Sequence, residues 1–393
     1  MRALYLRKGA DRRLRAGHLW IYSNEVDTQR SPLGQFDPGD TVCVHDAGGT
    51  VLGSAYVEPQ SLICARLYAP GIEQAFDASL MTDRLQRSLA VRESLFDTPY
   101  YRLVYGDSDG LPGIVADRFG EYVVVQLNNA SVERYREPLM EALCAVAKPA
   151  GIALRLDSRQ RREQGLDATG EVAYGQLPEE VPLVENGVQF SAPVFTGQKT
   201  GWFYDHRQSR AQLQQWVAGK RVLDVYSYVG GWGVQAATAG ASTVLCVDSS
   251  ASALECVNTN ARLNGVETTV QTQRGQATEV MTDLLEQRAR FDVVVIDPPA
   301  FVTKRKALKK GMAAYRRINE LALKLLAPNG LLVSASCSMH LSPDDLLTCM
   351  QQAAVRAGTS LRVVAQGGQG PDHPVHPAIP ETQYLKAFFA VRD

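Results

Sequence analysis

Two residue types capable of covalent catalysis follow apolar runs near the end of the sequence. The run 291–296 leads into Asp297, Pro298 and Pro299, and the run 330–336 leads into Cys337. Both runs are typical of buried strands, and the two prolines stiffen the chain just after Asp297. In a parallel sheet, the carboxyl ends of the strands share one edge. We therefore expect the Asp297 carboxyl group and the Cys337 thiol to lie close together.

Such a pair suits the methylation of carbon 5 of a pyrimidine. Carbon 5 is too weak a nucleophile to take a methyl group directly, and a thiolate that adds to carbon 6 raises its electron density. A carboxyl group at ring nitrogen 3 stabilises the adduct by protonation or hydrogen bonding, a role that Asp297 fits. The reaction requires Cys337 to ionise readily, so its surroundings must lower its pKa.

A second group of residues has the pattern of a cofactor site. The strand predicted at 221–225 contains Asp224 and runs into a turn with Gly230 and Gly231. The spacing is not the G-x-G-x-x-G of a dinucleotide site, and an acid there would repel a pyrophosphate. The carboxylate of Asp224 instead suits the ammonium group of S-adenosylmethionine (SAM). Asp248, at the end of the next predicted strand, is placed for ribose hydroxyls, a feature that both cofactor classes share.

Basic residues gather in two places. The first 35 residues are rich in Lys and Arg, and the segment after Phe301 carries cations with no acid until Glu320. Beside a site that modifies a base, such runs favour contacts with RNA phosphates, and the target base must leave its stack. The predicted RNA-binding residues are Arg12, Arg13, Arg15, Lys304, Arg305, Lys306, Lys309 and Lys310.

Strands and helices must position these residues, and the sequence pattern divides the chain into three parts. Residues 1–72 are short alternating runs with turns, typical of a small β-barrel, and 73–185 mix helical and strand patterns. Residues 186–393 alternate strands and helices, which predicts a doubly wound parallel sheet of α/β class. A final apolar run at 384–391 is predicted to add an edge strand. The strands expected in this last part are 221–225, 243–247, 268–273, 291–296, 330–336 and 361–365, and the clearest helices are 251–264 and 313–326.

Composition agrees with a globular enzyme and narrows its setting. The 393 residues are 21% charged, with a formal net charge of −1, which excludes a polycation of histone type. The seven Cys residues form no CxxC pair, so we expect reduced thiols and no metal site. No apolar leader and no run of about 18 apolar residues is found. The sequence predicts a cytoplasmic protein without a membrane partner.

Several motifs in the same order resemble those of the bacterial 23S ribosomal RNA (cytosine-C5) methyltransferases of the large-subunit methyltransferase I type. The resemblance covers essentially the whole chain. Its most specific parts are 198–207 (QKTGWFYDHR), 224–231 (DVYSYVGG), 297–301 (DPPAF), 336–338 (SCS), 372–375 (DHPV) and 384–386 (YLK).

This resemblance implies a PUA-like RNA-binding domain at 1–72, a central α+β domain at 73–185 and a Rossmann-like class I methyltransferase domain at 186–393. It implies that Cys337 is the nucleophile, Asp297 its acid partner and 23S ribosomal RNA, free or partly assembled, the substrate. A homodimer is compatible with it. The cofactor-binding residues that it implies, together with the strand-end acids, are Gln198, Thr200, Phe203, Asp205, Asp224, Tyr226, Ser227, Gly230, Asp248, Ser249, Gln276, Ala277 and Asp297.

Other functions stay open at this stage. Uracil C5 methylation uses the same thiolate chemistry and is disfavoured only by the resemblance. Amino-group methylation of adenine (N6) or guanine (N2) uses a related motif, but there the aromatic residue directly follows the second proline, and here Ala300 intervenes before Phe301. A non-catalytic RNA-binding assembly factor and, more distantly, a nicotinamide dehydrogenase complete the alternatives. The group that removes the C5 proton is not identified.

Overall fold

The computed structural model describes residues 1–156 and 170–393, which form two compact units. Unit 1 comprises Met1–Val181, Val194–Trp202 and Pro371–Thr382. Unit 2 comprises Pro182–Pro193, Phe203–Gly370 and Gln383–Asp393. The division into three domains at 1–72, 73–185 and 186–393 stays a prediction.

Unit 1 begins with a small β-structure over the first 70 residues. Its strands pair in the order β1-β3-β4-β5-β2, with β1 parallel to β3 and the others antiparallel. The β3–β4 turn is fixed by Asp46, whose carboxylate accepts from the amides of Gly48 and Thr50. The elements are β1 (Arg2–Tyr5), α1 (Arg12–Arg15), β2 (Trp20–Tyr22), β3 (Thr41–His45), β4 (Val51–Val57) and β5 (Ile63–Pro70).

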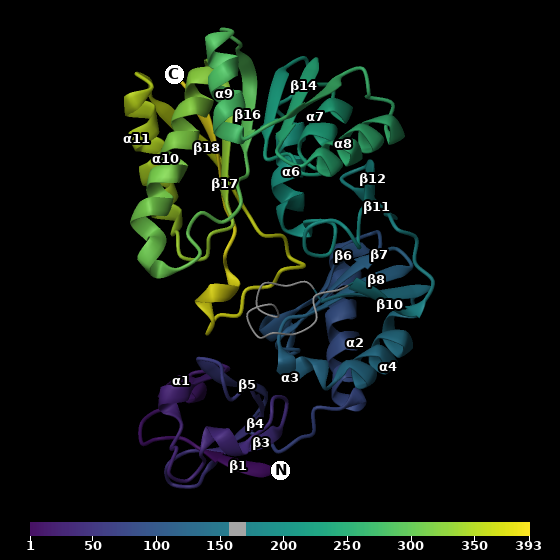
Figure 1. Ribbon diagram of the computed structural model, residues 1–393, viewed down its shortest axis with the longest axis vertical. Coiled ribbons are helices and arrows are strands. Elements are labelled where there is room, and N and C mark those ends of the chain that lie inside the picture. Colours follow the sequence, from purple (N-terminus) through teal and green to yellow (C-terminus); the bar gives the residue numbers. More distant parts are fainter. Residues whose placement is uncertain (157–169) are drawn as a thin grey trace. The chain divides into compact units, whose positions relative to one another are not determined.

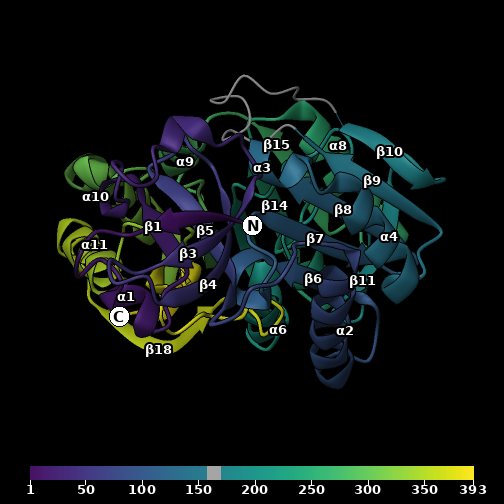
Figure 2. The same ribbon diagram turned by 90° about the horizontal axis from the view of Figure 1, so that it is seen from below.

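A second sheet of unit 1 has the order β10-β9-β8-β7-β6. Helices α2 and α4 pack against each other and share one apolar core with this sheet (Figure 2). The helix α2 begins after Asp77, whose side chain accepts from the amide of Leu80 and so caps the first turn. The elements are α2 (Ala78–Leu95), β6 (Tyr100–Tyr105), η3 (Gly106–Asp109), β7 (Ile114–Phe119), β8 (Tyr122–Leu127), α3 (Ala130–Glu133), α4 (Arg136–Ala147), β9 (Gly151–Arg155) and β10 (Gly170–Gly175).

Unit 2 is built on a seven-stranded sheet with the order β15-β14-β13-β16-β17-β19-β18. The five strands from β15 to β17 are parallel, whereas β19 is antiparallel to both of its neighbours. A separate hairpin joins β11 (Val181–Glu185) and β12 (Val188–Ala192). The sheet strands are β13 (Arg221–Val225), β14 (Thr243–Asp248), β15 (Val270–Arg274), β16 (Phe291–Ile296), β17 (Leu326–Ser336), β18 (Leu361–Gly368) and β19 (Lys386–Arg392).

Helices cover both faces of this sheet, as expected for a doubly wound α/β domain (Figure 1). The helices α9, α10 and α11 pack together on one face, and α6, α7 and α8 lie on the other. Their bounds are α6 (Arg207–Gln214), α7 (Gly233–Thr238), α8 (Ala251–Leu263), α9 (Ala277–Glu286), α10 (Leu308–Leu325) and α11 (Pro343–Arg356), with the short η5 (Arg305–Ala307) before α10.

The edge strand predicted at 384–391 is wrong in its position. The strand β19 lies inside the sheet, between β17 and β18, and makes the sheet mixed rather than wholly parallel. The backbone of β19 pairs with β17 on one side and with β18 on the other, and its successive residues Ala387, Phe388, Phe389 and Ala390 are buried because both faces of the strand are covered as well. Among residues 1–156 and 170–393, no helix has the length and apolar character needed to cross a membrane.

Candidate functional site

The predicted site residues of unit 2 follow the strands around the point where the winding of the sheet reverses. The chain passes from β13 outward to β14 and β15, then returns to β16 on the other side of β13. Ligands of open α/β sheets bind outside the carboxyl ends of the strands at this switch point. The register places Val225 beside both Val247 and Ile296, and Ile296 beside Ser334. The strand ends that carry Asp224, Asp248, Asp297 and Cys337 therefore meet at one edge.

Asp224 is fully buried near the end of β13. Its Oδ2 accepts a hydrogen bond of 2.9 Å from the amide of Gly233, at the start of α7, and its Oδ1 is buried without a partner among the described residues. Burial raises the pKa of Asp224 to about 7, against the lowering effect of the Gly233 amide, and the charges of Asp297 and Asp248 raise it further. A cation bound at Oδ1 would relieve this cost.

The turn after β13 has a backbone suited to close contact with a ligand. Tyr226 and Tyr228 both have positive φ, at 66° and 50°, an uncommon conformation for residues with a side chain. Gly230 has φ 86°, and a Cβ there would lie 2.9 Å from a methyl group of Val234. The hydroxyl of Ser227 is buried without a partner among the described residues. This turn thus combines strain with an unpaired polar group.

Asp248 is held in a fixed orientation at the end of β14. Its two carboxylate oxygens accept from the amides of Tyr228 and Ser250, at 3.0 and 2.9 Å. Further lone pairs remain on these oxygens for hydroxyl donors. The neighbouring Ser249 is exposed, as is Gln276, the residue before α9, while Ala277 is buried at its first position.

The segment 198–207 is divided between the two units. Phe203 belongs to unit 2 and stacks edge-on against Tyr228, with ring centroids 5.5 Å apart. Asp205 is also in unit 2, where its Oδ2 accepts from the Tyr384 hydroxyl. Gln198 and Thr200 belong to unit 1, and the Thr200 hydroxyl donates to Asp117. Their contribution to the cofactor site stays a prediction.

Asp297, directly after β16, has two partners that the sequence reasoning did not select. The indole Nε1 of Trp232 donates to Oδ2 at 3.1 Å, and Nε2 of the buried His206 lies 3.2 Å from Oδ1, although without the alignment of a hydrogen bond. Burial opposes ionisation, but His206 and Trp232 together hold the pKa of Asp297 below its usual value. Asp297 is therefore a carboxylate. His206 lies within motif 198–207 and Trp232 directly follows motif 224–231. These motifs were the sequence signal that could have identified the two partners.

Cys337 lies just past the end of β17 and is partly exposed. Its Sγ is 3.9 Å from the carbonyl oxygen of Pro298, the residue after Asp297. The flanking serines fix this turn, because the Tyr315 hydroxyl bonds to both Ser336 Oγ and Ser338 Oγ, at 2.8 and 2.9 Å. The structure thus brings the thiol and the DPP motif together at one edge of the sheet.

A lysine beside this turn was also missed. Lys386, the first residue of β19, is buried, and its Nζ donates to the carbonyl oxygens of Ser338 and Tyr384 at 2.6 and 2.9 Å. Burial lowers the pKa of Lys386 to about 8, while the negative charges of Cys337 and Asp345 oppose this shift. A buried cation thus stands close to the thiol. Motif 384–386 contained Lys386, but the sequence does not show that this residue lies close to Cys337. That follows only from the position of β19 inside the sheet.

The predicted RNA-binding residues fall into two electrostatic groups. On α1, Arg13 is paired with Glu25, and Arg15 with Asp11 and Asp46, while Arg12 is exposed. The predicted RNA-binding residues from Lys304 to the start of α10 are all exposed, and no acidic residue follows them in the sequence before Glu320. The latter group is Lys304, Arg305, Lys306, Lys309 and Lys310.

The residues of unit 2 fit the methyl donor SAM. Asp224 Oδ1 and Ser227 Oγ are buried polar atoms with no partner among the described residues, and Asp248 presents an oriented carboxylate. Asp224 would hold an ammonium group, and Asp248 the ribose hydroxyls. The positive φ values at Tyr226, Tyr228 and Gly230 let the backbone approach the ligand between them.

Comparison with protein families agrees with this architecture. A family model described as S-adenosylmethionine-dependent methyltransferase matches residues 122–389, and one described as PUA-like domain matches residues 4–70. These matches confirm the predicted fold class and the cofactor, SAM.

Similar proteins cover the whole chain. Proteins named ribosomal RNA large subunit methyltransferase I, from Erwinia tasmaniensis and Vibrio cholerae, are each 35% identical over 393 residues, covering 98% of both chains. A SAM-dependent methyltransferase structure from Streptococcus mutans has a TM-score of 0.85 at 21% identity over 100% of both chains. Another structure with the same values was solved in complex with S-adenosylhomocysteine (SAH). The chain therefore belongs to the S-adenosylmethionine-dependent methyltransferases, in the family of the ribosomal RNA large subunit methyltransferase I proteins.

Proposed function

We propose that this protein transfers a methyl group from SAM to carbon 5 of a cytosine in 23S ribosomal RNA, through a covalent bond between Cys337 and carbon 6. The observation that carries the proposal is the partly exposed Cys337 thiol 3.9 Å from the Pro298 carbonyl, beside Asp297 and at the same sheet edge as the cofactor residues. Amino-group methylation needs no thiol at this place. The ribosomal RNA substrate is supported by the names of the 35%-identical relatives.

The reaction follows from the groups at this edge. The Cys337 thiolate adds to carbon 6, and the electron pair moves to carbon 5, which takes the methyl group. A solvent base then takes the proton from carbon 5, the electron pair of that bond restores the double bond between carbons 5 and 6, and the pair of the Sγ–carbon 6 bond returns to Cys337 as thiolate. SAM, when bound, supplies the methyl group as a sulfonium.

Asp297 binds the base edge in this proposal. As a carboxylate it accepts from the exocyclic amino group of cytosine, which is a donor. His206 lies against this carboxylate, with its Nε2 3.2 Å from Asp297 Oδ1. Although burial raises the pKa of Asp297, His206 and Trp232 hold it below its usual value, so Asp297 accepts from the base as a carboxylate.

Lys386 makes the thiolate accessible near neutral pH. A buried ammonium group close to Cys337 favours the ionised thiol by charge attraction. Two carbonyl acceptors hold its Nζ in place, and one of them belongs to Ser338, the residue after the nucleophile. These two hydrogen bonds therefore hold the cation near the thiol.

The test is the pair of variants Cys337→Ala and Cys144→Ala, assayed with 23S ribosomal RNA and SAM. Cys337→Ala is expected to bind SAH like the wild type but to transfer no methyl group, because the carbon 6 adduct cannot form. Cys144, partly exposed on α4 in unit 1, is the control and is expected to keep full activity. Mass mapping of the modified nucleoside should give 5-methylcytidine. Full turnover by Cys337→Ala, or 5-methyluridine or an N-methylated purine as product, would refute the proposal.

A further inference from the structure

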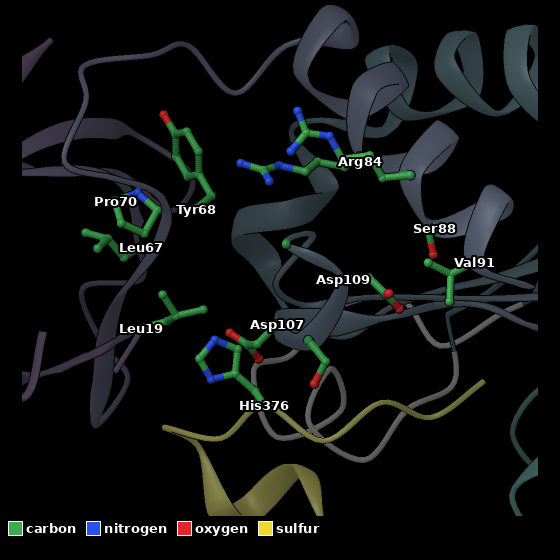
Figure 3. A pocket seen from close by; sticks show the side chains of 13 residues that line it. Leu19, Leu67, Tyr68, Pro70, Arg84, Ser88, Val91, Asp107, Asp109 and His376 are labelled. Atoms are coloured by element: carbon green, nitrogen blue, oxygen red, sulfur yellow. The ribbon is translucent and has the colours of Figure 1, made fainter. Parts of the chain in front are cut away.

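Unit 1 contains a cavity that the reaction does not use. Its volume is about 350 Å³, within the range of small-ligand sites. It is formed by β5 and the start of β2 on one side, by α2 on another and by η3, with His376 from the segment Pro371–Thr382 (Figure 3). One wall is apolar and consists of Leu19, Leu67 and Pro70, while Val91 of α2 lies on another side (Figure 3).

The acids of this cavity are already neutralised by other arginines. Asp109 makes two hydrogen bonds of 2.7 Å with the buried Arg92. Asp107 pairs with Arg66 at 3.3 Å and accepts from the Trp20 indole at 2.9 Å. These carboxylates therefore do not need Arg84 as a partner.

Arg84 is the cation that remains. Its Nε is buried without a hydrogen-bond partner, and no acid forms an ion pair with it within 1–156 and 170–393. Its Cδ, Nε and Cζ pack over Gly110, where φ is 72° and an added Cβ would lie 3.2 Å from Arg84 Cδ and 3.3 Å from Nε. The stem is therefore held while its guanidinium faces the hollow together with Tyr68 (Figure 3). An unpaired guanidinium in this setting favours a phosphate.

Ser108 supplies a second polar atom without a partner. Its Oγ is buried in the lining of the cavity and has no hydrogen-bond partner among the described residues. Buried polar atoms without partners cost free energy unless a ligand or water satisfies them. A guanidinium, a hydroxyl and an apolar wall in one cavity match the phosphate, the sugar or base edge and the flat base face of a nucleotide.

We propose that this cavity binds one nucleotide of the RNA substrate, with its phosphate on Arg84 and its base against the wall formed by Leu19, Leu67 and Pro70. The proposal rests on the RNA substrate of the proposed function and adds a second point of attachment for it. Arg87, one turn further along α2, adds positive charge at the rim, where its pair with Asp83 is exposed and weak. The occupant is an unstacked nucleotide, since a stacked base could not reach the apolar wall.

The experiment measures binding of the full chain to a 23S ribosomal RNA transcript across a salt series. Arg84→Gln is expected to bind about ten-fold more weakly, and the slope of log K against log salt should fall by about 1, because one phosphate contact is lost. Lys220→Gln removes one exposed charge in unit 2 and is the control, with less than about a two-fold change. Ser108→Leu fills the cavity without changing charge, so it should weaken binding while leaving the salt slope unchanged.

The outcomes separate this proposal from the proposed function. At saturating RNA, Arg84→Gln should methylate at the wild-type rate, because Arg84 takes no part in the chemistry. Equal RNA binding by Arg84→Gln and Lys220→Gln, or wild-type binding by Ser108→Leu, would overturn the nucleotide site alone. A wild-type chain that does not bind the transcript would overturn both proposals. If Arg84→Gln changes only the affinity for cytidine monophosphate, the cavity takes a free nucleotide and the RNA attachment is refuted.

Discussion

The chemistry proposed at Cys337 depends on side chains that come from three separate strands and loops. The thiol follows β17, Asp297 follows β16, and Lys386 begins β19. Each is polar, and Lys386 is buried by its strand position. The Lys386 cation and the Cys337 thiol act on each other more strongly than they would in water, because the surrounding protein screens charge less.

The role of Lys386 can be tested at the thiol itself. In Lys386→Met, the pH at which iodoacetamide alkylation of Cys337 reaches half its plateau should rise by about one unit, because the cation that favours the thiolate is gone. The difference from the wild type should be largest below pH 8 and should shrink above it, because Lys386, with a pKa of about 8, loses its own charge there. Mass spectrometry of the Cys337 peptide measures the rate.

Lys386→Arg separates charge from structure. Arginine keeps its charge at all pH values of the assay, so this variant should retain an early alkylation midpoint. A purely structural role, in which Lys386 only anchors the Ser338 carbonyl, predicts no shift of the midpoint in Lys386→Met. That result would remove the lysine from the proposed mechanism.

Asp224 makes cofactor binding dependent on pH. Its pKa, raised by burial to about 7, means that it is mostly protonated below pH 7. If it holds the ammonium group, SAH affinity should fall by about ten-fold per unit as the pH drops below 7. Asp224→Asn keeps an acceptor for the Gly233 amide, and it should bind weakly and without this pH dependence between pH 5.5 and 7.5. Calorimetry with SAH would refute the assignment if both proteins gave the same pH profile.

At the scale of elements, the sequence predicted the strands and helices whose position depends on the spacing of nearby apolar residues. The strands at 221–225 and 291–296 match β13 and β16 at both ends, and the helix expected at 251–264 matches α8 within one residue. The same apolar runs also predicted that Asp224 lies in a strand and that Cys337 directly follows one, as in β13 and β17. The position of β19 was missed because the order of strands depends on pairing between distant segments, which periodicity does not encode. For the same reason, His206 and Lys386 were not selected.

The interior position of β19 has a direct consequence for stability. Ala387 pairs with Ala335 on one side and Gly367 on the other. Ala387→Pro should therefore lower the free energy of unfolding by about 3 kcal/mol or more, since proline removes a ladder hydrogen bond and clashes with its neighbours. Val364→Pro falls at the irregular register of the edge strand β18, where proline is tolerated, and should cost far less. If urea unfolding gave the same loss of unfolding free energy for Ala387→Pro and Val364→Pro, the interior position of β19 would be contradicted.

At the scale of the whole molecule, the chain passes between the two units five times, after Val181, Pro193, Trp202, Gly370 and Thr382. The changes of residue pattern along the sequence predicted domains that follow one another in the chain. Such patterns do not show where a segment that returns to an earlier domain packs. Residues Pro371–Thr382 belong to unit 1 although they lie between β18 and β19 of unit 2. Each unit therefore depends on residues supplied from distant parts of the sequence.

Asp372 is the residue through which this returning segment is fixed in unit 1. It is fully buried, its Oδ2 accepts from the Arg102 amide at 3.0 Å, and its Oδ1 lies 2.9 Å from Nδ1 of His373. Asp372→Ala should destabilise unit 1 by about 2–4 kcal/mol, because it leaves buried donors without an acceptor. Hydrogen exchange should then show lower amide protection in β6–β9 and unchanged protection in β13–β16.

The control and the cofactor complete this test. Asp393→Ala removes an exposed carboxylate that pairs with Arg362, and such surface pairs contribute little, so protection should remain as in the wild type. SAH affinity of Asp372→Ala should also be unchanged, because Asp372 belongs to unit 1 and Asp224, Ser227 and Asp248 belong to unit 2. If protection were lost first in β13–β16, the segment Pro371–Thr382 would stabilise unit 2 instead, and the two units would have to unfold as one cooperative structure.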